Sequence, residues 1–127
     1  MQLLLDTHAF LWWQLATDQL SDHARSSIAD RSNQVFVSAV SVWEIATKRR
    51  LGKVAFDTSP TGAIGANGFI EMPILATDAE AAGELDWAHN DPFDRLLVAQ
   101  ARARGITLVT ADAAIRAYSG VAQLAAR

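Results

Sequence analysis

The chain contains no cysteine among its 127 residues, which excludes disulfide bonds and thiolate metal ligands. It also contains no apolar run near the roughly 20 residues that a membrane-spanning helix requires. Its N-terminus lacks a basic segment, and Asp6 interrupts the apolar start, so we expect no signal peptide. Together these absences predict a protein of the reducing cytoplasm with no membrane partner.

An excess of positive charge is absent too. The formal net charge is −3, from 11 basic and 14 acidic residues, which is not typical of a nucleic-acid-binding protein. Five of the acids form a candidate cluster, namely Asp6, Glu44, Asp91, Asp94 and Asp112. The other nine acids face 11 basic residues, so a cluster neutralised by metal ions would no longer oppose a polyanion. The charge balance therefore permits a nucleic-acid partner without requiring one.

The length and the 50% hydrophobic content predict one domain over residues 1–127. Apolar runs predict strands at residues 2–5, 35–38 and 106–110, and edge strands within 69–74 and at 121–124. Helices are expected over about residues 7–16, 24–31, 40–51, 77–88, 92–104 and 111–118. Residues 57–68 are expected to form a loop with a weak helix, and the structure of segment 57–72 stays open. Alternating strands and helices predict an α/β fold with a mostly parallel sheet.

The stretch from His89 to Ala101 has the pattern of a helix start. Asp91 is a favourable N-cap, Pro92 suits the first helical position, and Asp94 lies three residues after the cap. Capping alone therefore explains each of these residues. It does not explain why further acids follow apolar strands elsewhere in the chain.

Acids follow two of the predicted buried strands directly. Asp6 comes after residues 2–5, and Asp112 comes after residues 106–110. Because ligand sites of parallel sheets lie outside the carboxyl ends of the strands, these acids are expected to share one site. Each also has a local interpretation: Asp6 can cap a helix, Asp112 can be a first-turn acid behind a Thr110 cap, and Glu44 can pair with Lys48 across one helical turn.

Carboxylates gathered at one end of a sheet repel one another unless cations lie between them. Magnesium and manganese prefer such oxygen ligands, whereas zinc would need the histidines or cysteines that this site lacks. We expect His8 and His89 to be structural or surface residues. A Mg²⁺ site, with Mn²⁺ able to substitute, suits phosphodiester hydrolysis by a metal-activated water. No serine or cysteine triad and no glycine-rich phosphate loop is present.

Four segments together resemble the PIN-domain nucleases, and more narrowly the VapC-type ribonuclease toxins of bacterial toxin–antitoxin pairs. They are residues 3–8 (LLLDTH), 37–48 (VSAVSVWEIATK), 91–97 (DPFDRLL) and 108–112 (LVTAD). The resemblance covers nearly the whole chain. It implies a PIN-like three-layer α/β/α fold with an acidic pocket at the carboxyl ends of the strands.

The resemblance also implies the roles of individual residues. The catalytic and metal-binding acids are expected to be Asp6, Glu44, Asp94 and Asp112, with Asp6 and Asp94 as the main ligands. Supporting or orienting positions are expected at Thr7, Asp91, Arg95 and Thr110, with Arg95 beside a neighbouring carboxylate. An RNA-contacting rim is expected at Lys48, Arg49, Arg50 and Lys53, although a solvated helix end explains these four as well.

The implied function is that of a Mg²⁺-dependent endoribonuclease, the toxin of a pair, with a cognate antitoxin and a homodimeric assembly. The pair Trp12 and Trp13 offers a surface for a partner, although core roles suit both residues. Two other functions stay open. One is a non-catalytic α/β module that binds metal or protein, and the other is a metal-dependent phosphatase.

Overall fold

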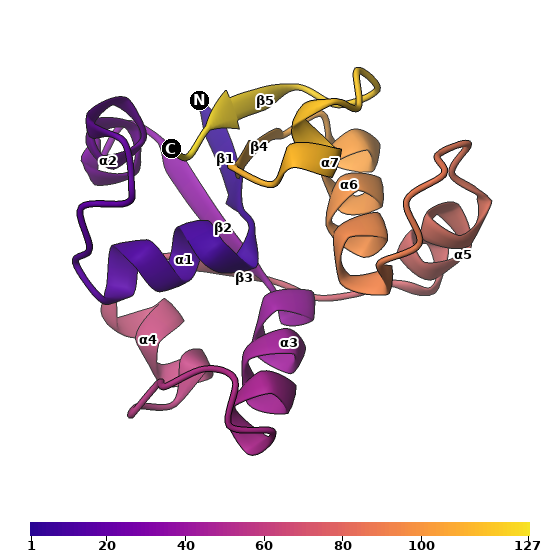
Figure 1. Cartoon of the computed structure of the whole chain (residues 1–127). Helices are drawn as coiled ribbons and strands as arrows, with labels where there is room; N and C mark the ends of the chain where they lie inside the picture. Colours follow the sequence, from indigo (N-terminus) through magenta and orange to yellow (C-terminus); the bar gives the residue numbers. More distant parts are fainter.

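In the computed structural model, which covers residues 1–127, the chain folds into a five-stranded sheet with helices on both faces (Figure 1). Its strands are β1 (Gln2–Leu5), β2 (Gln34–Ser38), β3 (Ile70–Met72), β4 (Thr107–Thr110) and β5 (Gln123–Ala125). Its helices are α1 (Thr7–Gln14), α2 (Asp22–Ala29), α3 (Ala39–Arg50), α4 (Pro60–Ala66), α5 (Ala76–Glu84), α6 (Pro92–Arg104) and α7 (Ala113–Arg116). None of the helices is both long enough and apolar enough to span a membrane.

The strand order is β3-β2-β1-β4-β5, and every neighbouring pair is parallel. The α/β expectation is confirmed, and the sheet is parallel throughout rather than mostly. The two short strands lie at the edges, as predicted. Pro73 follows β3 directly, where its missing N–H removes no hydrogen bond from the sheet. All five carboxyl ends therefore meet at one side of the molecule.

Alternation along β1 divides the core into two layers. Leu3 and Leu5 pack into a cluster with residues of α1, α2 and α4, whereas Leu4 packs into a second cluster with residues of α6 and α7. Helix α3 contributes Ile45 to the first cluster and Val40 to the second. It begins immediately after β2, so its first turns lie at the carboxyl ends of the central strands, beside α6 (Figure 1).

Several predicted boundaries differ from the structure. The open segment contains a true helix, α4, because Ser59 caps it and Pro60 occupies its first turn. Helix α5 ends at Glu84 rather than near residue 88, and residues 85–91 form a loop instead. Helix α7 is a single turn. The helix predicted over 7–16 stops at Gln14, and Ala16 adopts a positive φ of 52°.

Candidate metal centre

A cavity of about 170 Å³ opens at the carboxyl ends of the strands. The segments that surround it are the residues after β1 and β4 and the helices α3 and α6. No hydrophobic residue lines it; its lining consists of Asp6, Thr7, His8, Glu44, Lys48, Asp91, Asp94 and Asp112. The fold therefore brings all four predicted catalytic acids, and Asp91 with them, into one small polar space.

Asp6 is held rigidly at the junction of β1 and α1. It caps α1, because its Oδ1 accepts a hydrogen bond from the backbone N–H of Ala9 at 2.8 Å. Its Oδ2 accepts a 2.6 Å hydrogen bond from the hydroxyl of Thr110 at the end of β4. The side chain is buried, and this burial raises its pKa to about 6 against the two hydrogen bonds, which lower it. Thr110 thus has the supporting position that was expected.

Glu44 lies on α3 and is also buried. The hydroxyl of Thr7 donates to its Oε1 at 2.6 Å, and the same hydroxyl lies 3.0 Å from that of Ser41. The ammonium group of Lys48, one turn further along α3, donates to its Oε2. Both oxygens of this carboxylate therefore already face donors. The predicted support from Thr7 is present in the structure.

Asp94 lies in the first turn of α6, and its Oδ2 is 2.7 Å from Nε2 of His89. One ligand atom from each of His89, Asp94 and Asp112 lies within 4.8 Å of the others. The pKa of Asp94 is raised to about 6: desolvation is the largest cause, the negative charges of Asp91 and Asp112 act in the same direction, and the hydrogen bond from His89 opposes them. We expected His89 to be a structural or surface residue, and the loop before α6 brings its ring against Asp94, where it holds the carboxylate by a hydrogen bond.

Besides Asp6, two of the acids cap helices: Asp91, as its local pattern predicts, and Asp112, which is itself the N-cap of α7 rather than a first-turn acid behind a Thr110 cap. Asp91 accepts from the backbone N–H groups of Phe93 and Asp94, and Asp112 accepts from that of Ile115. Capping and cavity lining are therefore compatible roles for one carboxylate. The capping role of Asp112 and the site interpretation describe the same side chain.

The residues suit a hard divalent cation. Carboxylate and hydroxyl oxygens dominate the lining, His8 also lines the cavity, and the imidazole of His89 lies within reach of Asp94 and Asp112. The pKa values of Asp6 and Asp94 are raised because their negative charges are poorly solvated, and a cation in the cavity would relieve that cost. The direct ligands of such an ion would come from Asp6, Asp94 and Asp112, with His89 beside them.

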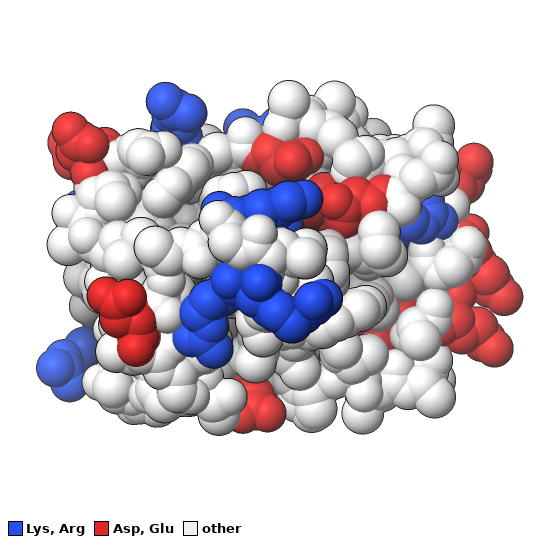
Figure 2. Space-filling view, turned by 60° about the horizontal axis from the view of Figure 1, so that its bottom comes forward, with Lys and Arg blue, Asp and Glu red and all other residues white.

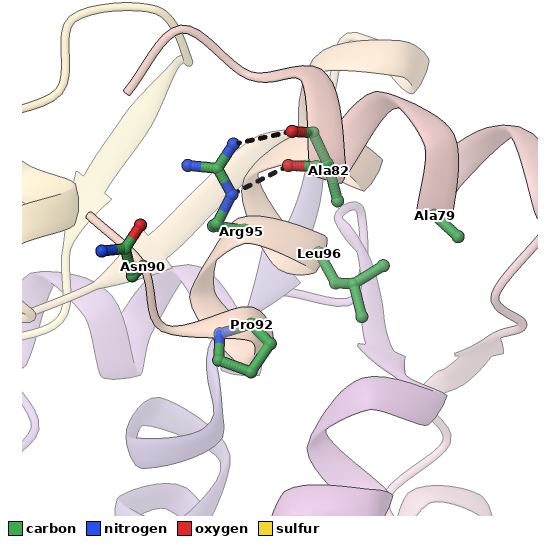
Figure 3. A pocket seen from close by; sticks show the side chains of 7 residues that line it. Ala79, Ala82, Asn90, Pro92, Arg95 and Leu96 are labelled. Atoms are coloured by element: carbon green, nitrogen blue, oxygen red, sulfur yellow. Dashed lines mark hydrogen bonds between the residues drawn. The ribbon is translucent and has the colours of Figure 1, made fainter. Parts of the chain in front are cut away.

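Arg95 supports the site without touching an acid. Its guanidinium donates to the backbone oxygens of Ala82, Gly83, Leu85, Trp87 and His89. Figure 3 shows this side chain reaching from α6 toward the end of α5 beside a separate cavity of about 230 Å³. The expected pairing of Arg95 with a carboxylate is therefore wrong. Its fork fixes the loop that carries His89 and Asp91, because carbonyls from the last turn of α5 and from the following loop surround it.

The expected basic rim has members with different surroundings. Lys48 lines the acidic cavity, whereas Arg49 donates to the carbonyls of Phe56 and Thr58 and fixes the loop after α3. Arg50 and Lys53 are exposed. In Figure 2, lysine and arginine side chains gather in the middle of one face, directly beside acidic side chains.

The tryptophans have different surroundings, and the core roles considered for Trp12 and Trp13 are the ones that the structure shows. Trp12 and Trp13 are half-buried and pack against the core, so they do not form the exposed surface suggested for a partner. Trp87 packs against the rings of His89 and Tyr118, with both pairs of ring centroids 4.9 Å apart. The exposed tryptophan is Trp43, which is 52% exposed and meets Phe93 edge-on at 4.7 Å. Sequence spacing does not separate these cases.

Comparison with known proteins places this arrangement in context. The family model of the PIN domain matches residues 3–121. The complex VapBC2 from Rickettsia felis, solved with a promoter DNA fragment, has a chain with TM-score 0.72 and 16% identity, covering 98% of each chain. A toxin–antitoxin complex from Klebsiella pneumoniae has a chain with TM-score 0.68 and 14% identity, covering 95% of this chain and 94% of that one.

A third similar structure is VapBC-5 from Mycobacterium tuberculosis, described as a member of a family of toxin–antitoxin systems. It has a TM-score of 0.60 and 18% identity, and the match covers 99% of this chain and 98% of that one. No curated protein matches the chain. At these identities the solved structures establish a common fold over the whole length.

Proposed function

The chain belongs to the PIN-domain family, and from this membership and its acidic cavity we propose that it is a Mg²⁺-dependent endoribonuclease. One observation carries the proposal: five carboxylates line one cavity with no apolar residue among them. Only Glu44 among them is paired with a lysine, and a protein has little reason to gather the remaining negative charge there unless a cation and an anionic substrate balance it. Mn²⁺ has the same ligand preference and is expected to replace Mg²⁺.

The reaction is hydrolysis of an RNA phosphodiester. One water is consumed: its oxygen bonds to phosphorus, the bond from phosphorus to the leaving oxygen breaks, and that oxygen takes up a proton. When bound, Mg²⁺ would lower the pKa of a water, and its positive charge would stabilise the negative charge of the phosphate. Asp6, Asp94 and Asp112 would hold the ion, while Thr110 and His89 keep Asp6 and Asp94 oriented through hydrogen bonds.

A carboxylate of the site can also take up the proton that the attacking water loses. Asp6 and Asp94 have pKa values of about 6, which lie nearer neutrality than those of ordinary carboxylates. Glu44 contributes negative charge that Lys48 balances, and the pair stays fixed by the hydroxyl of Thr7. The hydrogen bonds and the ion pair of these residues support the proposed roles.

The toxin role is a second part of the proposal. Chains of similar fold come from complexes described as VapBC or toxin–antitoxin. We infer a cognate antitoxin whose basic side chain enters the acidic cavity and displaces the ion, and a homodimer that places two cavities along one groove. We expect expression of the wild-type chain to arrest growth and expression of Asp94→Asn not to do so. Co-expression of the cognate antitoxin is expected to reverse the arrest.

The biochemical test compares substrates. Purified protein with Mg²⁺ is expected to cleave single-stranded RNA internally, to lose this activity in EDTA, and to leave p-nitrophenyl phosphate intact. Hydrolysis of the small ester without RNA cleavage would establish the phosphatase alternative instead. A folded protein that binds Mn²⁺ and cleaves neither substrate, across several RNAs, would favour the non-catalytic module.

A further inference from the structure

The acidic cavity is best described as two halves. One half holds the ion pair of Glu44 with Lys48, and the other holds Asp6, Asp94 and Asp112. Glu44 is 6% exposed, and its two oxygens accept from the Thr7 hydroxyl and the Lys48 ammonium. The side chain of Lys48 is 33% exposed, and its residue lines the cavity together with the acids. This half of the site therefore carries its own permanent cation.

The other half has no such cation. Asp6, Asp94 and Asp112 form no ion pair with a lysine or an arginine, since the lysine and arginine ion pairs of the molecule are Lys48 with Glu44 and Arg104 with Asp78. Ligand atoms of Asp94, Asp112 and His89 lie within 4.8 Å of one another. The acids that lack a lysine or arginine partner, and therefore most need a divalent ion, lie on this side.

An ordinary surface pair does not describe Glu44 and Lys48. Exposed pairs four residues apart on a helix contribute only about 0.3–0.5 kcal/mol, because water competes for both charges. Here the carboxylate is buried, and Lys48 is one of the residues that line the cavity. Of the three N–H groups of an ammonium, one is used by Glu44, so two remain for a further acceptor in the cavity.

We propose that Lys48 takes the place of a second metal ion, so that the site binds one divalent cation and Lys48 donates to an oxygen of the scissile phosphate. Two-metal nucleases use a second ion about 3.5–4 Å from the first to stabilise the phosphate as its charge grows. A lysine ammonium supplies positive charge at a fixed point without a second ion. The contact with phosphate rests on the function proposed above, whereas the number of ions does not.

Counting bound ions tests the first part directly. Titration of the metal-free protein with Mn²⁺, followed by electron paramagnetic resonance and calorimetry, is expected to give one ion per chain. Lys48→Met frees the carboxylate of Glu44 and is expected to bind two. Lys48→Arg and Lys53→Met, which keep a cation at position 48, are expected to bind one. Two ions in the wild-type protein, or one ion of unchanged affinity in Lys48→Met, would overturn the proposal.

A double variant protects this test against misfolding. Lys48→Met leaves Glu44 buried without its partner, which destabilises the fold. Lys48→Met combined with Glu44→Gln removes both charges and is expected to fold and bind one ion, since the second site needs Glu44. Two ions in this double variant would show that the second site lies elsewhere, and would overturn the assignment to Lys48.

Cleavage kinetics test the second part. Lys48→Met is expected to lower the single-turnover rate about 10²–10³-fold, as the loss of one fixed transition-state donor does in other enzymes. Lys48→Arg is expected to recover part of that rate, and the apparent affinity for RNA is expected to change much less. An unchanged rate in Lys48→Met would refute the phosphate contact. One bound ion with no RNA cleavage by the wild-type protein would refute the ribonuclease function and leave the ion count standing.

Discussion

The hydroxyl of Thr110 donates to Oδ2 of Asp6 at 2.6 Å, although 104 residues separate the two positions. The same hydroxyl oxygen accepts the backbone N–H of Asp112 at 3.1 Å. One threonine at the end of β4 therefore fixes two of the acids, and it joins the first strand to the residue that follows the fourth. The site is assembled by the parallel pairing of β1 with β4.

Removing this hydroxyl is expected to weaken metal binding. In Thr110→Val the pKa of Asp6 rises further, because the hydrogen bond that lowers it is lost while burial stays. Mn²⁺ affinity at neutral pH is expected to fall by about tenfold, the equivalent of about 1.4 kcal/mol. Thr110→Ser keeps the hydroxyl and serves as the matched control. Equal Mn²⁺ affinity in Thr110→Val and Thr110→Ser would show that the hydroxyl of Thr110 does not support metal binding.

The carboxylates of Asp6 and Asp94 are expected to lower the free energy of unfolding of the metal-free protein. Asp6 and Asp94 have pKa values raised by desolvation, so their ionised forms are disfavoured in the folded protein at pH 7. Asp6→Asn and Asp94→Asn are each expected to stabilise the metal-free protein by about 1–2 kcal/mol, or several degrees in Tm. Thermal unfolding in EDTA measures this directly.

Asp78 provides the opposite case. It is a buried carboxylate too, but the guanidinium of Arg104 donates to both of its oxygens and holds its pKa below the usual value. Asp78→Asn is therefore expected to destabilise the protein by about 3 kcal/mol or more, because it leaves Arg104 without its partner. A fall in Tm for the cavity variants similar to that of Asp78→Asn would show that their charges are already well compensated.

The pH dependence follows from the same pKa values. Between pH 3.8 and about 6 the folded protein binds more protons at Asp6 and Asp94 than the unfolded chain does. Their contribution to the free energy of unfolding therefore falls as pH rises through this window, and it is largest below it. Mg²⁺ needs the ionised forms, so its affinity is expected to fall as pH drops below about 6. Unfolding curves across this range, with and without Mg²⁺, separate the two effects.

Arg95 is expected to act on the site through the loop that it holds. Arg95→Lys keeps the charge but cannot reach five carbonyl oxygens at once, so residues 85–91 lose their shared donor. We expect a drop in stability of about 2 kcal/mol and faster amide exchange in this loop. Arg102→Lys is the comparison, because Arg102 is exposed and donates to Tyr118 alone. Equal exchange in both variants would contradict the role of Arg95.

Much of this site could be predicted from sequence because its signals are local. An acid directly after an apolar strand, as at Asp6 and Asp112, is placed at the carboxyl end by the strand itself. Asp94 is placed by its cap, Asp91, and by the proline between them. Glu44 follows from the helix that begins where β2 ends. Strand ends, helix starts and caps therefore locate these acids along the chain, whereas the resemblance to the PIN-domain nucleases implied that the four act together.

The rest depends on contacts between distant segments, which periodicity does not encode. His89 reaches Asp94 because α5 ends early and the carbonyls of the following loop surround Arg95. These carbonyls are the hydrogen-bond partners of Arg95 in place of the expected carboxylate. No sequence pattern indicates such backbone partners. Helix α4 forms in a glycine-containing segment because its residues Ala63 and Ile64 pack into the core. Tertiary packing overrides weak helix propensity there.

RNA cleavage by a matched set of variants tests the central claim most directly. The set is the wild-type chain, Asp6→Asn, Asp94→Asn, and Asp18→Asn as an exposed acid outside the cavity. With Mg²⁺, we expect cleavage by the wild type and Asp18→Asn, no cleavage by the two cavity variants, and none by any protein in EDTA. Cleavage that persists in EDTA, or in folded Asp6→Asn and Asp94→Asn, would contradict the claim that a metal ion held by these carboxylates hydrolyses RNA.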